Sequence, residues 1–190
     1  MNVEFKNNKG VCIWLTGLPC AGKTTLAKGL YQFLKEKGVK VKLYDGDKVR
    51  KTISKDLGFS REDRIENMRR VALRALEDIK NGYIVIVALV SPYKAARELI
   101  RKMFGNGSFI EVFVDAPLEV CMERDTKGLY QKALAGLIKN FTGIDDLYEQ
   151  PENPEIHIKT DIKDKEHTLN KIKEIIWQYL KDRSFEGKNK

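Results

Sequence analysis

The chain has 190 residues, of which 42% are hydrophobic and 33% are charged, a composition typical of a globular protein with a buried core. No apolar run reaches the roughly 18 residues of a membrane-spanning helix, and the first residues do not resemble a signal peptide. The formal net charge of +8 fits either a nucleic acid or a small polyanionic substrate, but no helix-turn-helix, RNP or finger spacing accompanies it. We therefore expect a cytoplasmic protein with neither a membrane nor a nucleic acid as partner.

Cysteine usage supports the same compartment. Cys12, Cys20 and Cys121 are odd in number and lack C-x-x-C or zinc spacing, so we expect no disulfide and a reducing environment. His157 and His167 lie far from them in the sequence, so a metal site built from His and Cys is not expected.

Short apolar runs alternate with stretches that repeat apolar residues at helical spacing. In chain order they predict a strand at 11–16, a helix at 23–37, a strand at 39–44, a short helix at 47–54, a helix at 60–81, a strand at 83–90, a helix at 92–104, a strand at 109–114, a helix at 118–124, a strand at 156–160 and a helix at 166–181. Strands that alternate with helices favour a parallel sheet with helices on both faces. The predicted fold class is α/β, a three-layer sandwich around a five-stranded parallel sheet.

The segment 125–150 differs from its surroundings because it is polar, rich in Gly and Lys, and lacks a strand. It is too short for a core of its own, so we expect a mobile helical or loop lid. Residues 1–181 then form one domain, and residues 182–190 form a flexible tail.

Residues 17–24 match the phosphate-binding pattern G-x-x-x-x-G-K-[ST], between a predicted strand and a predicted helix. The backbone N–H groups of such a P-loop face a phosphate, and the following helix adds its positive end. Lys23 would pair with the β- and γ-phosphates of ATP, and Thr24 would offer its hydroxyl to Mg²⁺. The predicted ATP-binding residues of the loop are Gly17, Leu18, Pro19, Cys20, Ala21, Gly22, Lys23, Thr24 and Thr25. The loop identifies the sandwich as one of the P-loop NTPase type.

Asp45 and Asp47 directly follow the strand predicted at 39–44. The carboxyl ends of parallel strands form the ligand-binding edge of such a sheet. The two carboxylates could orient Mg²⁺-bound water or accept a hydroxyl proton. The strand at 83–90 is followed by Ser91 and not by the aspartate usual there, which makes Asp45 and Asp47 the favoured catalytic carboxylates on the metal side of the site. We expect Asp47 to bind the metal together with Thr24.

Further motifs resemble those of the adenylylsulfate (APS) kinase family. They are DGDKVR at 45–50, DLGFSREDRIENMRR at 56–70, SPY at 91–93, IEVFVDAPLEVCMERDTKGLY at 110–130, FTGIDD at 141–146 and YEQPENPEI at 148–156. The resemblance covers about residues 10–180 in unbroken order. It implies a P-loop kinase that uses ATP to phosphorylate the ribose 3′-hydroxyl of APS, giving 3′-phosphoadenylylsulfate and ADP. It also allows a homodimer.

The resemblance implies five acceptor-binding residues. The rings of Phe59 and Phe141 would sandwich the APS adenine, while Arg50, Arg64 and Asn67 would hold its phosphosulfate and ribose. Their chemistry suits this acceptor, since aromatic rings stack on bases and arginine forks bind oxyanions.

It implies four more contacts. Val90 would be an apolar substrate contact, Lys127 would lie near the transferring phosphate, and Arg124 would lie against the ATP adenine. Ser91 matches a serine often described as a phosphoserine intermediate. We prefer an orienting role for Ser91, because in-line transfer between two bound nucleotides needs no phosphoenzyme.

Three residues depart from the family pattern, in which Asn, Arg and Gly are common at these places. They are Lys48, Leu134 and Asn140. They leave open an alternative function, a related P-loop kinase acting on another nucleotide-like acceptor. A nucleotide-dependent switch or nucleic-acid-binding regulator is a third hypothesis, but the presence of Asp45, Asp47 and Lys127 argues against it.

Overall fold

The computed structural model describes residues 10–105, 107–160 and 165–186, with only the backbone described for 183–186. In chain order its elements are β1 (Val11–Thr16), α1 (Lys23–Glu36), β2 (Val41–Asp45), α2 (Gly46–Lys51), α3 (Arg61–Lys80), β3 (Ile84–Ala88), α4 (Lys94–Phe104), β4 (Phe109–Asp115), α5 (Leu118–Glu123), α6 (Leu129–Leu134), β5 (Ile156–Lys159) and α7 (Lys165–Glu186). All five strands pair in parallel, in the order β2-β3-β1-β4-β5. The predicted five-stranded parallel α/β sheet is confirmed.

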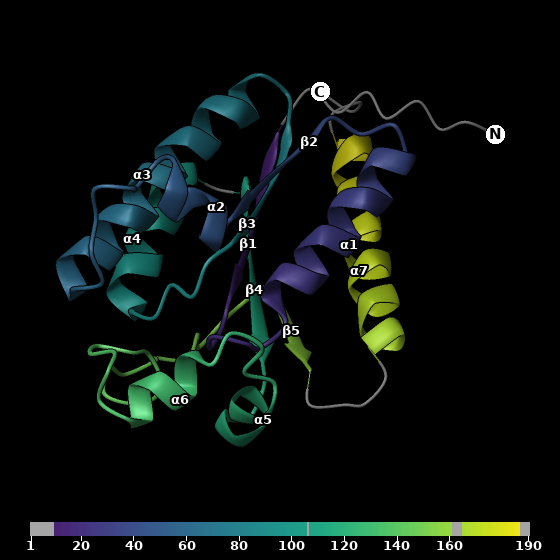
Figure 1. The fold of residues 1–190 in the computed structure, drawn as a ribbon. Coiled ribbons are helices and arrows are strands. Elements are labelled where there is room, and N and C mark those ends of the chain that lie inside the picture. Colours follow the sequence, from purple (N-terminus) through teal and green to yellow (C-terminus); the bar gives the residue numbers. More distant parts are fainter. Residues whose placement is uncertain (1–9, 106, 161–164, 187–190) are drawn as a thin grey trace.

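The molecule has three layers. Figure 1 shows the sheet nearly edge-on, with α1 and α7 on one face and α3 and α4 on the other. Helices α5 and α6 lie below the sheet in this view, at the end where α1 begins. This end is the carboxyl edge of the strands, because α1 starts directly after the loop that follows β1. The predicted ligand-binding side therefore faces α5, α6 and their connections.

The central strands owe their position to their composition. Every residue of β1 and β3 is buried, as expected for parallel strands covered on both faces. Helix α1 buries Leu26, Leu30 and Leu34 on the side of the sheet that it shares with α7. Burial of each leucine side chain contributes roughly 1.5–3 kcal/mol. This packing fixes the start of α1, and with it the end of the P-loop.

Strand β3 is shorter and α4 begins later than predicted, because the chain between them makes other contacts. After Ala88 the Val90 carbonyl accepts from Gly17 N–H, and Ser91 takes a left-handed backbone with φ of 50°. The first helical N–H, at Lys94, donates to a Glu149 carboxylate oxygen at 2.6 Å. The lid segment thus caps α4, a long-range contact that no local pattern predicts.

Helix α7 extends five residues beyond its predicted end. Residues 182–186 of the predicted tail are therefore helical, and residues 187–190 lie outside the described residues.

The lid segment is better packed than its polarity predicts. Helix α6 buries Tyr130 and Ala133, and Phe141 and Thr142 are also buried. Tyr130 and Phe141 belong to the same apolar cluster as β1 and α1. The segment has no separate core, because its few apolar side chains join the main core. Movement of the segment stays a prediction.

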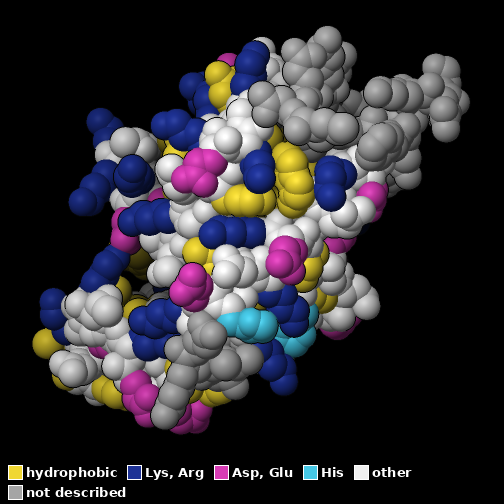
Figure 2. Space-filling model, turned by 90° about the vertical axis from the view of Figure 1, so that its right-hand side faces the viewer, with side chains coloured by type: hydrophobic (Ala, Val, Ile, Leu, Met, Phe, Trp, Pro, Cys, Tyr) yellow, Lys and Arg dark blue, Asp and Glu magenta, His cyan; other side chains and the backbone are white. Residues whose placement is uncertain are grey.

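Figure 2 shows how the basic side chains are distributed on one face of the molecule. On the face drawn in Figure 2, Lys and Arg are interspersed with acidic and apolar side chains. Within the part of the chain that the structure describes, no helix has the length and apolar character to cross a membrane.

Candidate active site

The P-loop has the backbone geometry that its glycines allow. Gly17 has φ of 151°, and a Cβ there would lie 2.3 Å from the Val114 carbonyl oxygen, so a side chain is excluded. Gly22, at the N-cap of α1, has φ of 100°, a region that favours glycine. The structure therefore places the predicted loop at the carboxyl edge of the sheet, against the end of β4.

Lys23 is buried beneath this loop, with 8% of its surface exposed. Its ammonium group donates to the Gly17 carbonyl at 2.8 Å and the Leu18 carbonyl at 2.6 Å. Burial lowers the pKa of the Lys23 amine to about 8, since desolvation disfavours its charged form. Among the hydrogen bonds of the described residues, Lys23 donates to neutral carbonyls alone. An anion such as a phosphate would stabilise its charge more strongly.

Oxygen groups cluster beside Lys23. Thr24 Oγ1 donates to Asp45 Oδ2 at 2.7 Å, and Asp45 Oδ1 accepts from Asp47 N–H at 3.2 Å as the N-cap of α2. A hydroxyl and a carboxylate at this spacing are ligands that suit Mg²⁺, which prefers oxygen and takes only one or two carboxylates beside phosphates. The chemistry of these side chains therefore fits a magnesium ion.

Asp47 and Lys127 bring the lid segment to the P-loop edge. Their side chains form an ion pair, and both are largely exposed, Lys127 at 54% and Asp47 at 67%. Arg124, predicted to contact the ATP adenine, donates to the Thr160 carbonyl. Thr160 in turn donates to the P-loop carbonyl of Ala21 at 2.7 Å. These contacts place Lys127 and Arg124 beside the predicted donor site.

Phe59 is the exposed ring of the predicted acceptor site, with 59% of its surface accessible. The guanidinium carbons of Arg50 and Arg64 lie 4.7 and 5.6 Å from its ring centroid. Arg64 also donates to the Phe59 carbonyl at 3.1 Å and to the Asn140 carbonyl at 2.6 Å. One arginine therefore joins the Phe59 loop to the residue that precedes Phe141.

Phe141 differs from Phe59 because it is only 8% exposed. Its ring packs edge-on against Tyr130, with centroids 4.9 Å apart. On α3, Asn67 is 5% exposed and its Oδ1 has no hydrogen-bond partner among the described residues. An unpaired buried amide oxygen is costly, and a ribose hydroxyl would satisfy it.

Val90 and Ser91 end the segment that follows β3. The Ser91 hydroxyl accepts a hydrogen bond from Trp14 Nε1 at 2.9 Å and is buried, with 3% of the residue exposed. The Val90 carbonyl accepts from Thr16 Oγ1 at 2.7 Å. The side chain of Ser91 is therefore used inside the fold in this structure.

Two positions near the site were not predicted. Tyr130 donates its hydroxyl to the Pro19 carbonyl of the P-loop at 3.0 Å. The Asp125 carboxylate accepts from the N–H groups of Leu129, Tyr130 and Gln131 at 2.8, 2.8 and 3.2 Å. Asp125 lies three residues before Gly128, the N-cap of α6, so the usual cap signal is missing from the sequence and α6 was not predicted.

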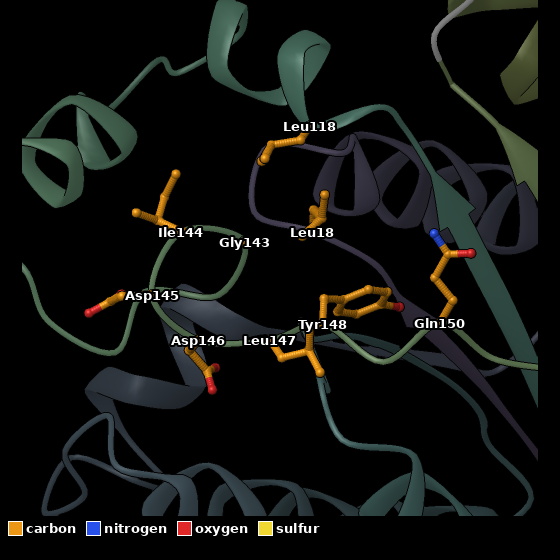
Figure 3. Close-up of a pocket in the computed structure, with 9 residues that line it drawn as sticks. All are labelled: Leu18, Leu118, Gly143, Ile144, Asp145, Asp146, Leu147, Tyr148 and Gln150. Carbon is orange, nitrogen blue, oxygen red and sulfur yellow. The ribbon is translucent and has the colours of Figure 1, made fainter.

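A cavity of about 450 Å³ lies beside the P-loop. Its lining residues, drawn in Figure 3, are Leu18, Leu118, Gly143, Ile144, Asp145, Asp146, Leu147, Tyr148 and Gln150. Only Leu18 among them is a predicted site residue, and the Tyr148 ring lies next to it in the view. The lid segment thus borders the P-loop on this side as well.

Comparisons with known proteins converge on one family. A model described as "Adenylylsulphate kinase" matches residues 9–159. An adenylyl-sulfate kinase of Synechococcus sp. is 51% identical over 177 residues, which cover 93% of this chain and 97% of that protein.

Solved structures agree. The APS kinase CysC of Mycobacterium tuberculosis, in complex with AMPPNP and APS, is 38% identical with a TM-score of 0.84, over 92% of this chain and 99% of that one. A hexameric APS kinase from Thiobacillus denitrificans is 31% identical with a TM-score of 0.67, over 94% of this chain and 30% of that longer chain.

Proposed function

Because this chain belongs to the adenylylsulphate kinase family, we propose that it delivers the terminal phosphoryl group of ATP to the ribose 3′-hydroxyl of adenylylsulfate. The reaction class follows from its relatives: the chain is a kinase that phosphorylates adenylylsulfate with ATP. The observation that carries the proposal is the exposed Phe59 ring, flanked by two arginines. A ring and two cations suit an acceptor that combines a base with oxyanions.

The donor half is the P-loop. When ATP binds, the Lys23 ammonium exchanges the carbonyls of Gly17 and Leu18 for the β- and γ-phosphates. The exchange replaces neutral partners with anionic ones in a poorly solvated position, where charge–charge attraction is strong. Lys23 thereby stabilises the charge that develops on the transferring group.

Magnesium is the expected metal. We assign Thr24 and Asp45 to its side of the site because their oxygens are already 2.7 Å apart. The sequence predicts Asp47 as the metal ligand, whereas we propose Asp45 for this role. When bound, Mg²⁺ would neutralise part of the phosphate charge.

Asp47 is then free to act on the acceptor. Its carboxylate is two-thirds exposed and bound to Lys127, whereas both oxygens of Asp45 are engaged. In our mechanism the 3′-hydroxyl oxygen attacks the γ-phosphorus in line, the bond to the β–γ bridging oxygen breaks, and ADP leaves. The hydroxyl proton passes to Asp47, and Lys127 turns from Asp47 to the transferring phosphate.

Ser91 has an orienting role in this mechanism. Its hydroxyl is bound by Trp14 in the interior, and direct transfer requires no covalent phosphoenzyme. Val90 directly precedes Ser91, and we propose that it is an apolar contact of the acceptor.

The setting of the enzyme is also a proposal. We infer a cytoplasmic enzyme, since Cys12, Cys20 and Cys121 are all free thiols, which suits a reducing compartment. We keep the homodimer as the expected assembly. The hexameric relative shows that a member of this family can self-associate, and light scattering would give the assembly in solution.

The test is to incubate the protein with MgATP and adenylylsulfate and to identify the product by mass and by phosphorus–proton NMR couplings. The expected product carries one new phosphate on the 3′-oxygen. A panel of nucleosides and sugars tests the alternative acceptor class. Phosphate on another oxygen, or faster transfer to a panel compound than to adenylylsulfate, would contradict the proposal.

A further inference from the structure

Arg97 is a buried cation in α4 that belongs to neither predicted substrate site. Only 4% of the residue is exposed. Its Nη1 donates to the Ser91 carbonyl at 2.8 Å, and its Nη2 donates to the Glu149 carbonyl at 2.6 Å. The two carbonyls are 58 residues apart in the sequence, so one guanidinium fork joins two distant segments.

The orientation of Arg97 is set by these carbonyls more than by its counter-ion. Arg97 Nε lies 3.0 Å from Glu111 Oε1, yet neither atom makes a well-aligned hydrogen bond within the described residues. The pair neutralises charge, while the aligned bonds go to Ser91 and Glu149. A buried ion pair of this kind adds little net stability, which suggests that Arg97 serves to position its partners.

Ser91 leads to the proposed acceptor half of the site. Ser91 follows Val90 and has a left-handed φ of 50°, a strained backbone that needs outside support. Its carbonyl receives that support from Arg97.

Glu149 is part of the stem that returns from the lid, residues 148–150. Its N–H donates to the Pro92 carbonyl at 2.9 Å, and its carboxylate caps α4 at Lys94. The adjacent Tyr148 ring lies 5.8 Å from the Arg97 guanidinium. Its hydroxyl is 2.9 Å from the Thr16 hydroxyl, directly before the P-loop.

We propose that Arg97 is a positioning residue for the acceptor, which holds the Val90–Ser91 segment and the lid stem in one fixed relation without touching either substrate. The inference rests on the proposed acceptor site. Arginine suits the task because its planar fork presents two donors in fixed directions. A lysine would keep the charge beside Glu111 but could align with only one carbonyl at a time.

The primary variant is therefore Arg97→Lys. We expect the KM for adenylylsulfate to rise at least tenfold, the KM for ATP to stay within about twofold, and the fraction of ATP hydrolysed without transfer to increase. Amide exchange at Glu149, whose N–H is bound to Pro92, should become faster. A merely structural role would raise both KM values or lower the melting temperature without this split.

Arg101→Lys is the matched control. Arg101 lies one turn farther along α4 and contacts the same Glu111, together with Glu155. Neither the Ser91 nor the Glu149 carbonyl accepts from it among the bonds of the described residues. We expect this variant to keep the wild-type KM for adenylylsulfate.

If Arg97→Lys does not fold, the double variant Arg97→Met, Glu111→Met removes both buried charges together, a change that cores often tolerate. The same acceptor-specific rise is expected there. A wild-type KM for adenylylsulfate in any folded Arg97 variant would overturn the inference. Failure of the wild-type protein to phosphorylate adenylylsulfate would instead overturn the proposed function, so the two failures are distinguishable.

Discussion

Replacing Lys23 with methionine should remove phosphoryl transfer and at the same time change how the free enzyme's stability depends on pH. The first effect follows from the loss of the only buried cation of the P-loop residues 17–24. The second follows from its pKa, which burial lowers from 10.5 to about 8. A lowered lysine pKa means that the folded state resists protonation at this site.

The sign of the pH effect can be worked out directly. Between pH 8 and 10.5 the unfolded chain binds a proton at Lys23 that the folded chain does not, so the stability of the wild type rises with pH in this range. At pH 7 the charged lysine costs the fold about 3 kcal/mol, since each pKa unit corresponds to about 1.4 kcal/mol. At pH 10 less than about 1 kcal/mol of this cost remains. The wild type should therefore gain about 2–3 kcal/mol relative to Lys23→Met between these pH values.

Urea denaturation at pH 7, 8, 9 and 10 measures this difference. Lys28→Met is the matched control, because Lys28 is an exposed residue of the same helix. Groups far from residue 23 cancel in the comparison, whereas Cys20 and Cys121 lose a nearby charge that lowers their pKa values. Parallel stability curves for the wild type and Lys23→Met would refute the reasoning, as would wild-type turnover in Lys23→Met.

Three further predictions concern the acceptor and the lid. Tyr130→Phe removes the hydroxyl that donates to the Pro19 carbonyl. We expect urea denaturation to show a free energy of unfolding lower by about 1–2 kcal/mol, together with a higher KM for ATP. Unchanged values would show that this bond is not maintained in solution. Phe59→Leu should weaken adenylylsulfate binding about tenfold or more in calorimetry, with ATP binding and stability unchanged because the ring is exposed. Equal losses of affinity for both nucleotides would show that Phe59 is not part of the acceptor site. In the free enzyme, amide exchange within 125–150 should be fastest at 135–140 and slow at Tyr130 and Glu149, which are hydrogen-bonded to the P-loop and to Arg97. Uniform exchange across the segment would show that these two bonds do not anchor it.

The donor half of the site was predictable because its signal is local. The spacing within 17–24 fixes a loop, and the buried runs of β1 and β3 place that loop at the sheet edge. The start of α3, predicted at residue 60, also has a local cause, since the Ser60 hydroxyl accepts from Asp63 N–H at 3.1 Å. A pattern within one turn or one strand predicts the local structure reliably, because the interactions that form this structure lie within the same few residues.

The acceptor half was less predictable because its contacts join distant segments. The burial of Phe141 depends on Tyr130, and the use of the Ser91 hydroxyl depends on Trp14, 77 residues away. Such pairings leave no period in the sequence. The family resemblance indicated which residues matter, but neither the exposure of Phe59 nor the burial of Phe141 followed from it.

The anchors of the lid segment limit what can move. The Lys127–Asp47 ion pair is exposed and is worth at most about 1 kcal/mol, a factor of about five in population. It cannot hold the segment closed.

The anchors at Tyr130 and Glu149 are partly buried hydrogen bonds to the P-loop and to Arg97. Breaking either bond would leave polar groups with little access to water unpaired. Between them, residues 135–140 are mostly exposed and contact the acceptor side through the Asn140 carbonyl and Arg64. Opening should therefore be confined to this tip, which is narrower than the lid of 125–150 predicted from composition. Arg64 contacts Phe59 and also donates to the Asn140 carbonyl at the tip. An acceptor whose oxyanions bind Arg64 would break the bond to Asn140. Binding of the acceptor would therefore determine whether the tip is held or free to move.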